Sequence, residues 1–153
     1  MFVDFAYYTD VYGGSLLSEQ EFNKNAFKAC VFITRATLLR VTDSSVNSFP
    51  NEVVTCIKKC ACHLAEDYSY IEKIVTNSLE AASQGKSGIK SESAGQVSVS
   101  YSDSEQTRKM FFDPKFVNEY LKTTLMQYLG PINVNGVIYN LLSKVISNNN
   151  CCC

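Results

Sequence analysis

The sequence predicts a mainly α-helical fold: a small bundle of three to four helices with an inserted β-hairpin and an extended C-terminal tail. Two stretches carry apolar residues at helical spacing, a third follows an Asp-Pro helix start, and one stretch between them alternates strictly. With 153 residues, 46% of them hydrophobic and 19% charged, the chain suits one ordinary domain with a buried core. We expect a helical domain over residues 1–130 and a C-terminal segment over residues 131–153.

The first predicted helix follows an aromatic-rich lead over residues 2–11 and a glycine turn at residues 13–14. Ser18 and Glu21 have the spacing of a capping box, in which the serine hydroxyl accepts from the amide three residues on. We expect the helix to continue to about Arg40. Apolar spacing predicts its buried face, which comprises Phe22, Ala26, Cys30, Ile33 and Thr37.

The second predicted helix begins at Pro50, after a polar loop. Proline suits a first helical position because its missing N–H would have no partner there. We expect this helix to end near Ala82 and to form the packing spine of the domain, because its apolar residues follow one face. That face comprises Ile57, Ala61, Leu64, Tyr68, Ile71 and Val75.

Residues 89–102 alternate in side-chain character on both sides of a Gly-containing turn. Val97, Val99 and Tyr101 share one face of the second half. This pattern predicts a β-hairpin. A lone two-stranded ribbon is marginal in water, so we expect it to lie on its own helices or on another copy of the protein. The ribbon is therefore a candidate assembly element.

The last predicted helix begins with Asp113 as N-cap and Pro114 as first residue, and it stops at residues 130–131, Gly-Pro. Its expected buried side comprises Phe116, Tyr120, Leu121, Thr124, Leu125 and Tyr128. Two alternatives stay open beyond it. The apolar residues from Val134 to Val145 fit a short amphipathic helix, and residues 137–139 equally fit a strand.

Charge and composition argue against several classes of function. The 14 basic and 15 acidic residues are interspersed, so we expect no concentrated positive field of the kind that binds DNA without sequence preference. Asp4 stands where a secretion signal would carry positive charge, so we expect no signal peptide and a protein made in a cytoplasm. No stretch approaches the roughly 18 apolar residues that cross a bilayer, so we expect no membrane contact.

Seven cysteines are many for this chain: Cys30, Cys56, Cys60, Cys62, Cys151, Cys152 and Cys153. Without a secretion signal, we expect reduced thiols. Cys56, Cys60 and His63 would share one side of a helix and could bind zinc with a fourth ligand from elsewhere. The chain lacks the paired C-x-x-C knuckles of structural zinc sites, so we interpret the cysteines as packing residues and expect no metal and no cofactor.

Nothing in the pattern favours an enzyme. His63 is the only histidine, and a Cys–His pair on one helix would lack an orienting group and an oxyanion site. The chain has no G-x-S-x-G, P-loop or G-x-G-x-x-G pattern, so we expect no catalytic residues. Nine Tyr and nine Phe without Trp instead favour extensive contacts with protein partners.

The hairpin segment resembles a known family. Residues 91–101 read S-E-S-A-G-Q-V-S-V-S-Y, and the last predicted helix ends in Tyr-Leu-Gly at residues 128–130. With the order of the helices, these motifs are similar to the head–tail connector (adaptor) proteins of tailed bacteriophages. The resemblance covers roughly residues 18–130. Beyond it the chain departs from the short Gly- and Arg-containing tail that usually ends the family.

The resemblance implies a structural virion protein of the neck between capsid and tail, made in the host bacterial cytoplasm. It implies a homo-oligomeric ring, a dodecamer, below the portal protein and above a stopper or tail-terminator protein. Double-stranded DNA would pass through without sequence-specific contact. A heterologous interface whose rotation closes would build such a ring.

We predict two contact surfaces for this assembly. The hairpin would make the contact between subunits or with the lower ring, through Ile89, Ser91, Ser93, Gly95, Val97, Val99 and Tyr101. The C-terminal segment would dock on the portal and become ordered there. Its predicted contacts are Ile132, Val134, Ile138, Tyr139 and Leu142.

Two other functions stay open. The chain would alternatively be a small helical regulator that binds nucleic acid or senses metal or redox state through its cysteines. A third hypothesis, nearer to the first, is a stopper or tail-completion protein in the same neck.

Overall fold

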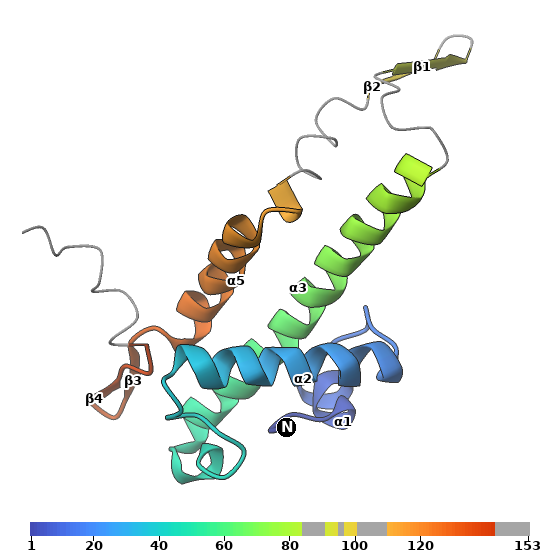
Figure 1. Ribbon diagram of the computed structural model, residues 1–153. Coiled ribbons are helices and arrows are strands. Elements are labelled where there is room, and N and C mark those ends of the chain that lie inside the picture. The colour runs from blue at the N-terminus through green and yellow to red at the C-terminus, as the bar shows by residue number, and fades with distance from the viewer. Residues whose placement is uncertain (84–90, 95–96, 101–109, 143–153) are drawn as a thin grey trace, which may run out of the picture. The chain divides into compact units, whose positions relative to one another are not determined.

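The computed structural model describes residues 1–83, 91–94, 97–100 and 110–142. The chain is mainly α-helical with a short antiparallel hairpin between its long helices, which confirms the predicted fold class (Figure 1). It divides into two compact units, one of Met1–Ser69 with Leu121–Cys153 and one of Tyr70–Tyr120. We call them the main unit and the ribbon unit.

The aromatic-rich lead forms two short helical turns, α1 (Phe5–Tyr7) and the π-helical η1 (Tyr8–Tyr12). Tyr8 is fully buried and stacks on Phe22, with 4.6 Å between the ring centroids. The glycine turn follows as predicted. A Cβ on Gly14 would lie 2.0 Å from the Tyr8 ring, so the chain can pass this close to the tyrosine only with glycine here.

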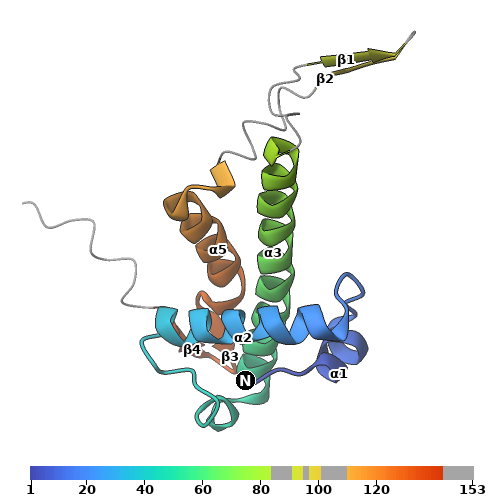
Figure 2. The same ribbon diagram turned by 45° about the vertical axis from the view of Figure 1, so that its right-hand side comes forward.

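The helix α2 (Glu19–Ala36) begins with the predicted capping box. The amide of Glu21 donates to the Ser18 hydroxyl at 3.4 Å, and the Glu21 carboxylate accepts from the Ser18 amide at 3.0 Å. All five residues of its predicted core face are buried: Phe22, Ala26, Cys30, Ile33 and Thr37. In Figures 1 and 2, α2 crosses α3. The inner face of α2 therefore belongs to the core of the main unit.

The predicted end of this helix at Arg40 is wrong, because α2 ends at Ala36. Leu38 and Leu39 have φ angles of 51° and 63°, which lie in the left-handed region. A right-handed helix cannot continue through such residues.

The helix α3 (Asn51–Ser83) starts directly after Pro50, whose carbonyl accepts from the amide of Val54 at 3.0 Å. It ends one residue beyond the predicted Ala82. Four residues of its predicted stripe are buried: Ile57, Ala61, Leu64 and Ile71. The other two, Tyr68 and Val75, are half-buried. The stripe is widened by further buried residues, namely Val53, Cys60, Cys62 and Ala65. The first half of α3 therefore buries more of its surface than a single apolar stripe would.

The ribbon unit carries β1 (Ser91–Ala94) and β2 (Val97–Ser100), which pair in antiparallel fashion from Ser91↔Ser100 to Ala94↔Val97. This pairing confirms the predicted hairpin. Of the predicted contact residues of the ribbon, Ile89, Gly95 and Tyr101 lie outside the described residues.

The helix α5 (Pro114–Leu129) begins as predicted, because the Asp113 carboxylate accepts from the amide of Lys115 at 2.9 Å. It ends directly before Gly130, where a Cβ would lie 2.7 Å from the carbonyl oxygen of Met126. Three residues of its predicted buried side are buried: Leu121, Thr124 and Leu125. The other three are half-buried: Phe116, Tyr120 and Tyr128. Leu129, which was not predicted, is also buried.

The segment after α5 is a second hairpin, β3 (Ile132–Val134) with β4 (Val137–Tyr139), so the helical alternative for this segment is wrong. Asn135 and Gly136 have φ angles of 51° and 85°, which is the geometry of a tight two-residue turn. The Asn133 side chain accepts from the amide of Gly136 at 3.0 Å.

Candidate assembly surface on helix α2

A tyrosine–carboxylate cluster fixes the N-terminal segment to α3. The Tyr8 hydroxyl donates to one carboxylate oxygen of Glu66 at 2.8 Å, and the Tyr12 hydroxyl donates to the other at 3.2 Å. The Tyr8 hydroxyl also accepts from the amide of Leu16 at 3.1 Å. Burial, followed by the contact with Glu66, raises the pKa of Tyr8 to about 12. The cluster holds the loop before α2 in a defined position.

A second polar cluster joins α3 to α5 inside the main unit. Asp67 is buried and accepts a hydrogen bond from the Thr124 hydroxyl at 2.8 Å. Nε2 of His63 lies 4.0 Å from Asp67, and its Nδ1 lies 3.2 Å from the Tyr128 hydroxyl. Burial, followed by the nearby Cys60 and by acidic side chains of α3, raises the pKa of the Tyr128 hydroxyl. The hydrogen bond between Thr124 and Asp67 links α5 to α3.

The described cysteines are free thiols, and three of them are buried: Cys30, Cys60 and Cys62. Burial raises the pKa of Cys30 to about 11 and that of Cys62 to about 12, and it raises the pKa of Cys60 as well. The thiolate is the form that binds metal and reacts. Among the described residues, no three His, Cys, Asp or Glu side chains form a group that could hold a metal. The burial of these thiols supports their interpretation as packing residues.

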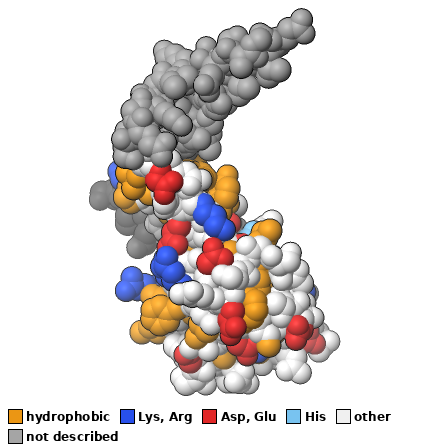
Figure 3. Space-filling model, turned by 90° about the vertical axis from the view of Figure 1, so that its right-hand side faces the viewer, with side chains coloured by type: hydrophobic (Ala, Val, Ile, Leu, Met, Phe, Trp, Pro, Cys, Tyr) orange, Lys and Arg blue, Asp and Glu red, His pale blue; other side chains and the backbone are white. Residues whose placement is uncertain are grey.

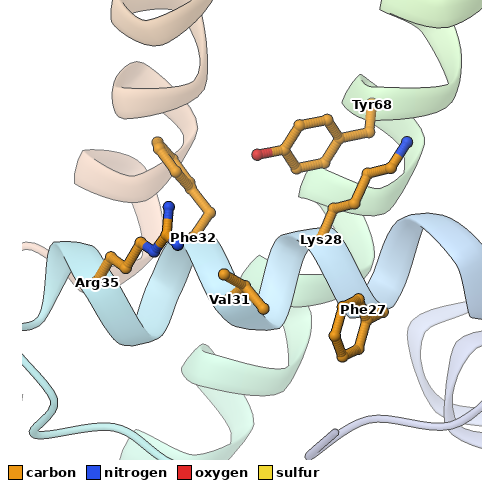
Figure 4. Close-up of a pocket in the computed structure, with 6 residues that line it drawn as sticks. All are labelled: Phe27, Lys28, Val31, Phe32, Arg35 and Tyr68. Atoms are coloured by element: carbon orange, nitrogen blue, oxygen red, sulfur yellow. The ribbon is translucent and has the colours of Figure 1, made fainter.

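The outer face of α2 carries an open groove of about 310 Å³ (Figure 4). Its lining is mostly apolar with two basic side chains: Phe27, Lys28, Val31, Phe32, Arg35 and Tyr68. Phe27 keeps 63% of its surface exposed. Nζ of Lys28 lies 5.9 Å from the centre of the Tyr68 ring, a cation–π distance. We call this surface the α2 groove.

Two exposed leucines follow the groove at the C-terminal end of α2. Leu38 and Leu39 are 55% and 71% exposed and both have positive φ angles. A left-handed conformation costs a residue with a side chain roughly 1–2 kcal/mol. Because these side chains are exposed, burial within the subunit does not offset that cost.

The predicted contact residues belong to both units. In the ribbon unit, Ser91 and Ser93 lie on β1, and Val97 and Val99 lie on β2. Ser91 and Ser93 pair with Ser100 and Ser98, so they lie on the opposite face of the ribbon from Val97 and Val99, and a single contact face for all four is wrong. In the main unit, the predicted portal contacts differ in exposure. Val134 and Leu142 are buried, Ile132 and Tyr139 are half-buried, and Ile138 is 66% exposed.

Sequence reasoning did not find the α2 groove. One signal in the sequence could have indicated it. Phe27, Val31 and Arg35 are spaced four residues apart, so they share one face of the helix, away from the predicted core face. The remaining wall comes from Tyr68 on α3, and only tertiary packing brings that residue to α2.

Surface charge is mixed on the face drawn in Figure 3, where acidic and basic side chains lie among hydrophobic ones. Within the part of the chain that the structure describes, no helix is both long and apolar enough to cross a bilayer. Comparisons of the chain with protein-family models, with curated proteins and with solved structures find no match.

Proposed function

We propose that this protein is a head–tail connector of a tailed bacteriophage, a structural subunit that forms a ring below the portal and joins the capsid to the tail. The observation that carries the proposal is the β1–β2 ribbon, inserted between the helices α3 and α5. Its residues are those that resemble the connector family.

The form of the ribbon supports a role in assembly. Its strands have four residues each, and among the described residues its sheet contains no third strand. Isolated hairpins of this size are marginal in water and gain stability when they lie on a larger surface. A neighbouring subunit in a ring would supply such a surface.

The charge of the chain supports a passage for DNA. The formal net charge is −1 at pH 7, and Lys and Arg do not form runs. A channel that lets double-stranded DNA slide should bind its phosphates weakly, since phosphate contacts with Lys and Arg provide most non-specific affinity.

The test is assembly with the portal ring of the same phage. We expect the purified chain, kept under reducing conditions, to add to that portal as a second ring visible by electron microscopy, with twelve copies. Stoichiometric zinc, or tight binding to duplex DNA, together with no ring on the portal, would overturn the proposal in favour of a regulator. A ring that binds only below a different connector would assign the chain to a stopper instead.

A pair of substitutions on β2 tests the ribbon. Val97→Asp with Val99→Asp should abolish the ring, because two charges then lie on the strand face that we expect to dock. Ser98→Asp with Ser100→Asp adds the same charge to the other face, which in the ribbon register also carries Ser91 and Ser93. It should reduce assembly less, because that face is already polar. Helical circular dichroism should stay largely unchanged in both. Unfolding of the Val97/Val99 variant would show that the ribbon belongs to the core of the subunit.

A further inference from the structure

We propose that the α2 groove receives the loop between η1 and α2 of a neighbouring copy of this chain. We call the segment of residues 10–19, which runs from η1 through that loop to the first residue of α2, the acidic loop. This inference rests on the proposed function, because it names a surface through which neighbouring copies in the ring would join. The proposed contact places Leu16 of one copy in the groove of the next.

The acidic loop presents apolar side chains to solvent. Val11 and Leu16 are 59% and 70% exposed. Asp10 and Glu19 are exposed on the same segment. The hydrogen bond from the Leu16 amide to the Tyr8 hydroxyl fixes the loop to the buried tyrosine. A loop fixed before binding loses less conformational entropy when it docks.

The α2 groove has the complementary character. Its lining is mostly apolar and includes the basic side chains of Lys28 and Arg35. Asp43, an acidic residue that follows α2, forms an ion pair with the N-terminal amino group of Met1, so its charge is already partnered within the subunit. Acidic side chains on both sides of an exposed leucine suit an apolar groove with two basic side chains.

The exposed leucines at the end of α2 extend this surface. Leu38 and Leu39 follow Arg35 closely in the chain and hold a backbone conformation that is costly for leucine. Backbone strain of this kind clusters at functional sites such as ligand clamps and switch regions. Burial of both leucines at an interface would offset the cost.

The acidic loop and the groove lie at different positions along α2. The acidic loop ends at Glu19, the first residue of α2, whereas Val31 in the groove lies about 18 Å further along the axis at the usual helical rise. A subunit thus carries two different complementary surfaces. Contacts between different surfaces are heterologous, and they close into a ring when the rotation between copies permits it.

Cross-linking tests the contact directly. In a background with the half-buried Cys56 and with Cys151, Cys152 and Cys153 changed to Ser, we would introduce Leu16→Cys and Phe27→Cys, singly and together. Both positions are exposed, so the variants should fold. With a short bis-maleimide, the double variant should give a ladder of covalent oligomers when rings form on the portal. Each single variant should give only the background of the chain with the four Ser substitutions alone.

Charge reversal provides an independent measurement. Arg35→Glu should lower the yield of rings at least tenfold, and addition of Glu19→Lys should restore much of it, because the pair then has opposite charges again. Lys24→Glu is the matched control, since it reverses a basic residue of α2 that does not line the groove. It should leave the yield within about twofold.

The outcomes separate this inference from the proposed function. Rings without a ladder, or without an effect of Arg35→Glu, would overturn the groove contact and leave the connector function standing. A cross-link in either single variant would show an isologous contact and would also overturn it. If the unmodified chain forms no ring on the portal, the proposed function itself fails.

Discussion

The two faces of α2 differ in how deeply their aromatic residues are buried in the folded subunit. On the inner face, Phe22 is fully buried and stacks on Tyr8. On the outer face, Phe27 keeps 63% of its surface exposed and lines the α2 groove. The same residue type therefore stabilises the subunit at one position and leaves an apolar surface for a partner at the other.

The largest expected effect is a difference between the two faces in how much an alanine substitution lowers the free energy of unfolding. Phe22→Ala should lower the free energy of unfolding by about 3–5 kcal/mol, because it removes a buried ring and leaves a cavity. Phe27→Ala should lower it by about 0.5 kcal/mol or less, because its ring is mostly in water. Urea denaturation followed by helical circular dichroism measures both.

A second pair of residues tests whether the difference in stability loss depends on the face of α2 and not on the residue type phenylalanine. Ile33 is fully buried on the inner face and Val31 lies in the groove. Ile33→Ala should cost about 2–5 kcal/mol and Val31→Ala clearly less. Equal losses at the two faces would mean that the outer face belongs to the core of the subunit.

The inner face could be predicted from the sequence because burial in a helix follows its period. Phe22, Ala26 and Ile33 recur at helical spacing, and each is fully buried. Helix starts were equally readable, since the Ser18 capping box and the Asp113 N-cap are local hydrogen bonds that a few neighbouring residues specify. The existence of the β1–β2 hairpin also follows from a local alternation, but its register does not, because Val97 and Val99 pair with Ala94 and Glu92 and not with the predicted contact residues of β1.

The end of α2 and the α2 groove could not be predicted from the sequence, because the local pattern does not specify them. Nothing near Leu38 and Leu39 marks a left-handed backbone, for which glycine is the usual signal, so the end of α2 was placed too late. The groove needs Tyr68 from another helix. The β3–β4 hairpin, in contrast, carried the Asn-Gly pair at residues 135–136, a strong hairpin signal that would have decided between strand and helix.

A smaller effect is expected at the end of the outer face. Leu39→Asn should raise the free energy of unfolding by about 1 kcal/mol, because asparagine tolerates the left-handed conformation better than leucine. The same change should weaken ring formation, because it removes an apolar side chain from the proposed interface. Urea denaturation and ring yield on the portal measure the two effects. A variant that is both less stable and fully competent in assembly would contradict the assignment of Leu39 to the contact surface.

The last expected effect concerns Tyr8, which stacks on the inner face of α2, at alkaline pH. The pKa of Tyr8 is raised from its ordinary value of 10 to about 12 by burial and then by the hydrogen bond to Glu66. The folded state thus favours the protonated hydroxyl. Its contribution to stability is complete below pH 10 and is lost as the pH rises from 10 toward 12.

Tyr8→Phe isolates this titration, since it keeps the ring that stacks on Phe22 and removes the hydroxyl. At pH 8 the variant should be less stable by about 1 kcal/mol, the usual net value of a hydrogen bond. Above pH 10 its stability should fall less steeply than that of the unmodified chain, although Tyr12, whose pKa is also raised by burial and by Glu66, still titrates. Urea denaturation at successive pH values measures both slopes. Parallel slopes would show that the Tyr8 hydroxyl is equally easy to ionise in the folded and unfolded chains, and that the tyrosine–carboxylate cluster does not hold the loop that we expect to dock.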